Sequence, residues 1–189
     1  SKNNFSVKIN NKSLFKYNNK KPKIAYFSAD FYNHATLHLM MDVFKNHDKS
    51  KFDIFGFSFG LDKNDEWKKE VKNYFLQFKE IGNISDSDVI NLVRDLKIDI
   101  AVDLKGFTTN NRSSIFSNRI APIQINYLGY PGTTAIQNMD YIIADELIIP
   151  KKNFRYFSEK VIHLPNCYQP NMHKRDISNK KFTRNEFGL

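Results

Sequence analysis

The stretch "KIAYFSADFYNHATLHLMMDVF", residues 23–44, decides the fold. Its residues 24–27 form a continuous apolar run, which is typical of a buried strand. The apolar residues between Leu37 and Phe44 then follow helical spacing and predict a mostly buried helix. Asp30 and His34 lie at the junction between the two, so polar chemistry is expected where a strand passes into a helix.

The same alternation continues along the chain. Apolar, β-branched runs predict further strands at 53–59, 98–104, 122–128 and 140–144, and helical patterns occur at 34–46, 65–77, 86–96 and 112–118. For the helix at 86–96, Asp86 or Ser87 is the expected N-cap. Repeated strand–helix–strand units predict an α/β fold, a Rossmann-like, doubly wound and mainly parallel sheet with helices on both faces.

Composition limits the class of protein. With 189 residues, 41% of them hydrophobic, the chain is long enough for one domain with a substantial core. The single cysteine, Cys167, excludes an internal disulfide and a thiolate metal cluster. No apolar run reaches the roughly 20 residues that cross a bilayer, and the first residues lack a signal-peptide pattern, so a cytoplasmic location is expected.

The net charge of +9 suggests nucleic-acid binding until its distribution is considered. Residues 1–23 hold seven of the 29 basic side chains and no acidic one, so residues 24–189 carry 22 basic and 20 acidic side chains. The folded part is therefore nearly balanced. No zinc-finger, helix-turn-helix or aromatic RNA-binding pattern accompanies the lysines, which favours a solvated leader over a nucleic-acid partner.

Ligands of open α/β sheets bind at the carboxyl ends of the strands, so the loops after the strands are the candidate sites. In the first loop, Asn33 is the expected helix cap, and His34 in the first turn is expected to be a neutral base or hydrogen-bond partner. Asp30 is expected to face the same crevice, or else to cap the backbone. His38 is expected to pack in the helix. A zinc site of His34 and His38 lacks a third ligand and is discounted.

Two further loops carry polar residues, and neither a G-x-G-x-x-G nor a Walker A motif is present. "KGFTTNNRSS", residues 105–114, combines a glycine turn with many hydrogen-bond donors, as suits an anionic or polar ligand. "LGYPGTT", residues 128–134, predicts a type II turn with Pro131 and Gly132 at its centre. Each loop alone is a weak signal.

Taken together, four segments resemble the catalytic region of the O-linked N-acetylglucosamine transferase family and its SPINDLY relatives. They are "IAYFSADFYNH", "DLKGFTTNNRSSIFSNRIAPIQINYLGYPGTT", "MDYIIAD" and "FSEKVIHLPNCYQP", in that order. The resemblance covers residues 23–189. It implies the N-terminal lobe of a two-lobed GT-B fold, with a basic leader at 1–22, a Rossmann-like lobe at 23–165 and a linker at 166–189 toward a C-terminal nucleotide-binding lobe.

The resemblance also implies roles for particular residues. Asp30 and His34 match the family's candidate catalytic residues at the sugar end of the cleft. Thr36, Leu128, Gly129 and Pro131 match positions around the donor sugar, and Thr109 and Arg112 match positions near the acceptor peptide. Two positions depart from the family pattern: Ala35 stands where a proline is frequent, and Thr109 stands where animal enzymes have lysine.

The implied reaction is inverting transfer of N-acetylglucosamine from UDP-GlcNAc to Ser or Thr hydroxyls of proteins, without a metal or other cofactor. The implied partners are the nucleotide sugar, the acceptor protein, a C-terminal lobe and, upstream, tetratricopeptide repeats. This lobe alone is expected to be inactive. Two alternatives stay open: a SPINDLY-like protein O-fucosyltransferase that uses GDP-fucose, and a non-catalytic Rossmann-like binding module.

Overall fold

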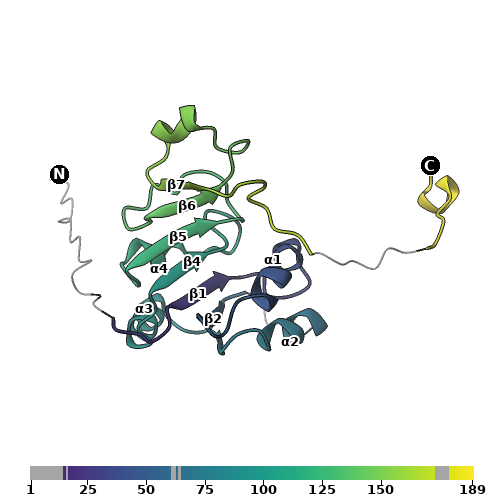
Figure 1. Ribbon diagram of the computed structural model, residues 1–189. Helices are drawn as coiled ribbons and strands as arrows, with labels where there is room; N and C mark the ends of the chain where they lie inside the picture. Colours follow the sequence, from purple (N-terminus) through teal and green to yellow (C-terminus); the bar gives the residue numbers. More distant parts are fainter. Residues whose placement is uncertain (1–14, 16, 61–62, 64, 173–178) are drawn as a thin grey trace, which may run out of the picture.

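The computed structural model describes residues 15, 17–60, 63, 65–172 and 179–189. Much of the predicted leader, residues 1–14 and 16, and part of the predicted linker, residues 173–178, lie outside these described residues. Seven strands form one sheet in the order β3-β2-β1-β4-β5-β6-β7, and every neighbouring pair is parallel (Figure 1). The predicted Rossmann-like α/β fold is confirmed.

The strands are β1 (Lys23–Ser28), β2 (Asp53–Ser58), β3 (Gln77–Glu80), β4 (Ile100–Asp103), β5 (Ile123–Tyr127), β6 (Tyr141–Ala144) and β7 (Lys160–His163). The α-helices are α1 (Ala35–Lys45), α2 (Glu66–Lys72), α3 (Asp86–Asp95) and α4 (Ser113–Ser117), with short 3₁₀ helices η2 (Lys151–Tyr156) and η3 (Arg184–Phe187).

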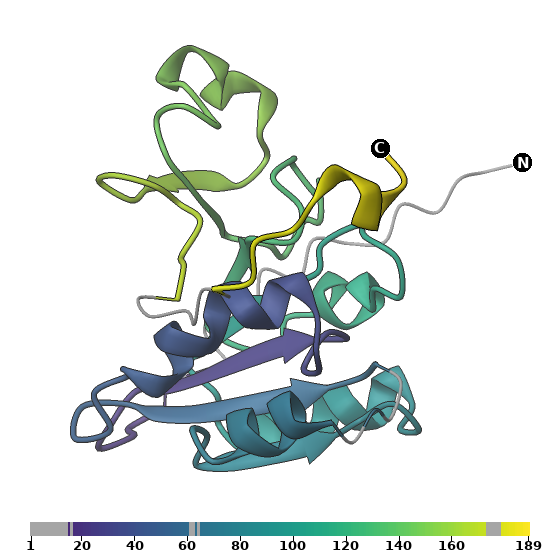
Figure 2. The ribbon, with the colours of Figure 1, turned by 90° about the vertical axis from the view of Figure 1, so that its right-hand side faces the viewer.

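The helices cover both faces of the sheet, as Figures 1 and 2 show. On one face, buried residues of α1 and α2 such as Met40, Phe44 and Val71 pack against Tyr26 of β1. On the other face, α3 and α4 pack against the alternate strand residues, among them Phe27. Successive side chains of a strand point to opposite faces, so the central strands β1, β2 and β4 supply both cores.

Two edge strands differ from the prediction. The helix predicted at 65–77 ends at Lys72, and residues 77–80 form β3, which pairs with β2. Residues 160–163 form β7, a strand absent from the prediction, which pairs with β6. Both are four residues long and largely half-exposed or exposed, so they lack the continuous apolar run of a buried strand.

Two helix caps also differ from the prediction. Ser85 caps α3, and its hydroxyl accepts a hydrogen bond from the Asp88 N–H at 3.2 Å. This cap lies one residue before Asp86 and two before Ser87, the predicted caps. His34, not Asn33, caps α1. Serine is a preferred cap residue, whereas a histidine in this position is unusual, and its ring therefore bears on the site.

Candidate active site

The loops that follow β1 and β4 meet at the point where the strand order reverses. β1 lies between β2 and β4 in the sheet, and the chain leaves β1 toward α1 on one face but leaves β4 toward α4 on the other. The two connections therefore diverge at the carboxyl ends of the strands. Open α/β sheets bind their ligands at this place.

A buried ion pair joins the two loops. The Nζ of Lys105, after β4, lies 2.8 Å from Oδ2 of Asp30, after β1, and both side chains are less than a tenth exposed. The carboxylate of Asp30 thus pairs with a side chain from another loop, and its backbone N–H donates to the Ser28 hydroxyl at 2.9 Å. Sequence reasoning singled out Asp30 but missed Lys105, which is 75 residues away.

His34 stands beside this pair and is held by the backbone of α1. Its Nδ1 accepts a hydrogen bond from the Thr36 N–H at 3.1 Å and lies 3.7 Å from Oδ2 of Asp30. A ring nitrogen that accepts carries no proton, so the neutral ring carries its proton on Nε2. In this state His34 can donate a hydrogen bond through Nε2 but cannot accept a proton there.

His38 has a different environment. Its Nε2 lies 2.9 Å from Oδ1 of Asn33, and its ring packs edge-on against Trp67 with 4.1 Å between the ring centres. The side chain is half-buried between the start of α1 and the start of α2. As predicted, His38 packs within the fold.

A buried carboxyl group ends the neighbouring strand β4. Asp103, the last residue of β4, is 2% exposed, and its Oδ1 accepts from the Lys105 N–H at 2.9 Å. Burial raises the pKa of Asp103 to about 6, although the Lys105 and Gly106 amides and the charge of Lys105 act in the opposite direction. Sequence reasoning missed Asp103, although it lies at the carboxyl end of β4 much as Asp30 lies just after the carboxyl end of β1.

Asn126 occupies the position beside Asp103 in the parallel pairing of β4 and β5. Its Nδ2 donates to the carbonyl oxygens of Tyr130 at 3.0 Å and Gly132 at 3.4 Å, which holds the loop at 128–134. Its Oδ1 is buried and has no hydrogen-bond partner within the described part of the chain. Asn126 therefore fixes the loop at 128–134 through one end of its amide.

The loop at 128–134 touches the loop that carries Lys105. A side-chain carbon on Gly129 would lie 2.2 Å from the Leu104 carbonyl oxygen and 3.2 Å from the Cα of Lys105, so no larger residue fits there. Leu128 has a positive φ of 71° and is 8% exposed within the core on the α1 face. Of the predicted donor-sugar residues, Gly129 thus lies against the backbone of Leu104 and Lys105.

Glu159 anchors the far end of the same loop. Its buried carboxylate accepts from the Thr134 N–H at 2.7 Å, from the Thr134 hydroxyl at 2.5 Å and from the Thr133 hydroxyl at 2.7 Å. Burial alone would raise the pKa of Glu159, but these hydrogen bonds outweigh it, and the pKa lies below its usual range. Sequence reasoning missed this contact, since Glu159 comes 25 residues after Thr134.

The predicted type II turn at Tyr130–Thr133 is wrong. A type II turn needs a positive φ at Gly132, but among the described glycines only Gly106 and Gly188 have one. A side-chain carbon at Gly132 would lie 2.9 Å from the Tyr130 ring, so a larger residue there would have to displace that ring. Gly106, with φ +53°, lies against the Cβ of the same tyrosine.

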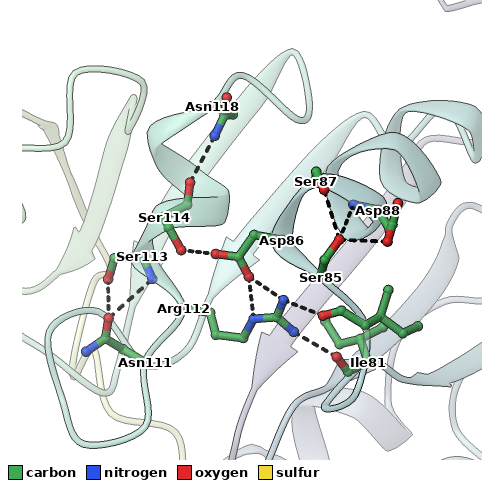
Figure 3. Close-up of polar contacts among 11 residues, drawn as sticks. Ile81, Ser85, Asp86, Ser87, Asp88, Asn111, Arg112, Ser113, Ser114 and Asn118 are labelled. Carbon is green, nitrogen blue, oxygen red and sulfur yellow. Dashed lines mark hydrogen bonds and ion pairs between the residues drawn. The ribbon is translucent and has the colours of Figure 1, made fainter.

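The guanidinium group of Arg112 forms hydrogen bonds with other residues of the chain, as Figure 3 shows. Its Nε donates to Oδ1 of Asp86 at 2.8 Å, and its two terminal nitrogens donate to the carbonyl oxygens of Ile81 at 2.7 Å and Ile84 at 2.8 Å. Asp86 also accepts from the Ser114 hydroxyl. These contacts tie the loop after β4 to the segment before α3, on the side of the sheet away from α1.

The remaining predicted site residues are Thr36, Thr109 and Pro131. Thr36 lies in the first turn of α1, where its backbone N–H bonds the His34 ring. Pro131 and Thr109 are exposed on their loops. Within the described residues, no three His, Cys, Asp or Glu side chains come together as metal ligands, and no helix is long and apolar enough to cross a membrane.

Comparisons with known proteins agree with this fold. The family model of glycosyl transferase family 41 matches residues 3–183. A probable UDP-N-acetylglucosamine–peptide N-acetylglucosaminyltransferase, SEC of Arabidopsis thaliana, is 34% identical over 175 residues, which are 90% of this chain and 18% of that protein. The UDP-N-acetylglucosamine–peptide N-acetylglucosaminyltransferase of Caenorhabditis elegans is 31% identical over 152 residues, 80% of this chain and 13% of that protein.

A solved structure gives the same result. A mutant of the O-GlcNAc transferase of Thermobaculum terrenum superposes with a TM-score of 0.77 at 25% identity, over 79% of this chain and 29% of that one. The chain therefore spans less than a third of each of these relatives. The fold is the Rossmann-like α/β lobe of a GT-B glycosyltransferase. On the extent of the family match, the chain belongs to glycosyltransferase family 41.

Proposed function

We propose that this chain is the acceptor-side lobe of an inverting transferase that moves N-acetylglucosamine from UDP-GlcNAc to Ser or Thr hydroxyls of proteins. The names of the plant and nematode relatives give UDP-N-acetylglucosamine as the donor and a peptide as the acceptor. The observation that carries the proposal is the buried Asp30–Lys105 pair beside His34, at the switch point of the sheet and against the loop at 128–134.

Each of the two predicted catalytic residues has a separate task. The carboxylate of Asp30 accepts the proton of the attacking hydroxyl, directly or through water. Before this transfer, Lys105 neutralises the negative charge of the buried carboxylate. His34 donates through Nε2 to an oxygen of the bound sugar or acceptor, because its Nδ1 is occupied by the backbone. Charge that develops on the departing diphosphate needs donors that this lobe shares with a second, nucleotide-binding lobe.

The loop at 128–134 holds the sugar. Its backbone is fixed at one end by Asn126 and at the other by Glu159, so its N–H and C=O groups are preorganised for hydroxyl and acetamido groups. Thr109 at the tip of its loop meets the acceptor, and Arg112 holds that loop in place. We propose that transfer needs no metal, since the acid–base groups and backbone donors suffice.

The test is a transfer assay on the full-length protein with UDP-GlcNAc and, in parallel, GDP-fucose. We expect N-acetylglucosamine on Ser or Thr of acceptor peptides, and we expect His34→Asn to lower turnover by about 10²-fold or more. His38→Ala is the matched control, because its ring packs against Trp67 and its loss should leave turnover per folded molecule nearly unchanged. Transfer of fucose alone would establish the alternative donor; no transfer of either sugar would favour a binding module.

A further inference from the structure

Two side-chain amides of strand β5, those of Gln124 and Asn126, are bonded unequally. Both residues are fully buried, and their spacing along the strand places them on the same face of the sheet. Nε2 of Gln124 donates to the carbonyl oxygens of Phe116 at 3.0 Å and Asn138 at 2.7 Å. Its Oε1 accepts from the Ile120 N–H at 2.8 Å. Both ends of the Gln124 amide are therefore bonded.

Asn126 is bonded at its nitrogen. Its Nδ2 donates to the carbonyl oxygens of Tyr130 and Gly132, and because carbonyl oxygens only accept, these contacts identify the bonded end of the amide as the nitrogen. The other end, Oδ1, has no hydrogen-bond partner among the residues that the structure describes. A buried acceptor without a donor is costly, so a donor for this oxygen is expected within the protein.

Asp103 is the partner of Asn126 in the sheet. The two residues pair in the register of β4 and β5, and paired residues of adjacent strands direct their side chains to the same face. Gly106 adjoins both of them. Its backbone N–H donates to the Asp103 carboxyl group, and a side-chain carbon on Gly106 would lie 3.2 Å from Oδ1 of Asn126. The carboxyl group and the unpartnered oxygen thus meet at the backbone of Gly106.

The elements around Asp103 favour its neutral form. Its paired residue in β1 is Phe27, and α4 adds apolar side chains to the core on this face. The charged and titratable groups of the adjoining loops are Asp30 and Lys105, which bond each other, Arg112, which bonds Asp86, and Tyr130. The charge of Lys105 lowers the pKa of Asp103, but burial outweighs it and raises the pKa to about 6.

We propose that Asp103 is a positioning residue of the transfer reaction: its protonated carboxyl group donates to Oδ1 of Asn126 and so holds the loop at 128–134 against the loop that carries Lys105. Loss of the proton leaves a carboxylate oxygen and an amide oxygen beside each other, and two acceptors repel. The role in the reaction rests on the proposed function, whereas the contact itself does not.

The order of the loop at 128–134 therefore depends on pH. While Asp103 holds its proton, the Asn126 amide is bonded at both ends and keeps the carbonyl groups of Tyr130 and Gly132 in place. When the proton leaves, the amide loses one bond and meets a negative charge, which weakens its hold on the loop. The proposed sugar site is thus better formed with the proton than without it.

The contact is tested by hydrogen exchange of side-chain amide protons in the ¹⁵N-labelled protein. The exchange rate at Asn126 is divided by the rate at Gln124, so that the general pH dependence of exchange cancels. We expect this ratio to rise about 3- to 10-fold between about pH 5 and about pH 7.5, the effect of one lost hydrogen bond. In Asp103→Asn, whose amide donates at every pH, the ratio should stay at its low value.

The matched control is Asp95→Asn, at the exposed end of α3, which should keep the wild-type rise. The same pH dependence of the ratio in wild type and Asp103→Asn overturns the proposal. A second measurement needs no variant: the carboxyl carbon of Asp103 and the side-chain amide of Asn126 should titrate with a common midpoint of about 6. Separate midpoints overturn the contact.

The role in the reaction is tested by the KM for UDP-GlcNAc in the full-length protein. Asp103→Asn should lower this KM about 3- to 10-fold at about pH 7.5, with kcat changed less, because its amide holds the loop where the wild-type carboxylate does not. A residue that only stabilises the fold gives no such gain when it is replaced. An equal or higher KM in the variant overturns the positioning role.

These measurements separate the two proposals. A common titration of Asp103 and Asn126 without sugar transfer by the full-length protein would keep the contact and reject the enzymatic function. Sugar transfer with a KM that Asp103→Asn does not lower would keep the function and reject the positioning role.

Discussion

The Nζ of Lys105 lies 2.8 Å from Oδ2 of Asp30, and this buried pair holds together the loops of two neighbouring strands. Because of this contact, a substitution of Asp30 has two effects. A neutral residue at position 30 removes the proposed proton acceptor and also leaves a buried ammonium group without a partner. Loss of activity in a single variant would therefore mix chemistry with stability.

We predict that Asp30→Asn and Lys105→Met each lower the free energy of unfolding by about 3–5 kcal/mol, the cost of one uncompensated buried charge. The double variant should lose clearly less than the sum, because neither charge remains. Urea denaturation of the four proteins measures this coupling. Additive losses would mean that the two side chains act independently.

For His34, the choice of substitution separates its two tasks. Asparagine is a good helix cap, so His34→Asn should keep the cap of α1 and remove only the donor at Nε2, whereas His34→Ala should lose the cap as well. We expect the alanine variant to be about 1 kcal/mol less stable than the asparagine variant, with turnover equally reduced in both. Thermal melts and single-turnover assays measure the two effects; full turnover in His34→Asn would limit His34 to a structural role.

Asp103 should make stability depend on pH. Its pKa of about 6 in the folded protein lies above the value of 3.8 for an unperturbed carboxyl, so Asp103 stays protonated to a higher pH in the folded state than in the unfolded state. Its contribution is therefore greatest below pH 3.8 and is lost as the pH rises through about 6, a change of about 3 kcal/mol. Asp103→Asn should remove this slope from urea denaturation measured between these pH values. An unchanged slope in the variant contradicts the assignment.

Glu159 should make stability depend on pH with the opposite sign to Asp103. Hydrogen bonds from Thr134 and Thr133 hold its pKa below the usual value of 4.5, so its stabilisation is present at neutral pH and is lost as the pH falls through the folded-state pKa. We expect Glu159→Gln to cost about 1.5–3 kcal/mol at neutral pH.

The loop at 128–134 should respond locally to the same change. Hydrogen exchange at the Thr134 amide, which donates to Glu159, should become faster in Glu159→Gln. Glu66→Gln is the control, because its side chain is 87% exposed and its loss should change neither the free energy of unfolding nor the exchange at Thr134 by a measurable amount. Unchanged exchange in Glu159→Gln would show that the loop is held by other contacts.

The sequence by itself determined the architecture and the family. The apolar run of β1 and the helical spacing of α1 are local patterns that can be read from the sequence. Each element has apolar residues to bury, so the helix is expected to pack against the sheet. The positions of Asp30 and His34 followed, because both lie within a few residues of a strand end. The long segment from residue 103 to residue 134 carried the family resemblance, which the family match confirms.

Only the tertiary structure decided which side chains meet. β3 and β7 are short edge strands, and they form because a neighbouring strand offers hydrogen bonds, not because of their own residues. The partner of Asp30 is Lys105, and the partner of Arg112 is Asp86, at separations of 75 and 26 residues along the chain. No pattern in the sequence encodes such a contact, because the crossovers of the parallel sheet bring distant loops to one edge. The same crossovers bring Arg112, a predicted acceptor contact, against Asp86, so that this side chain also holds its loop.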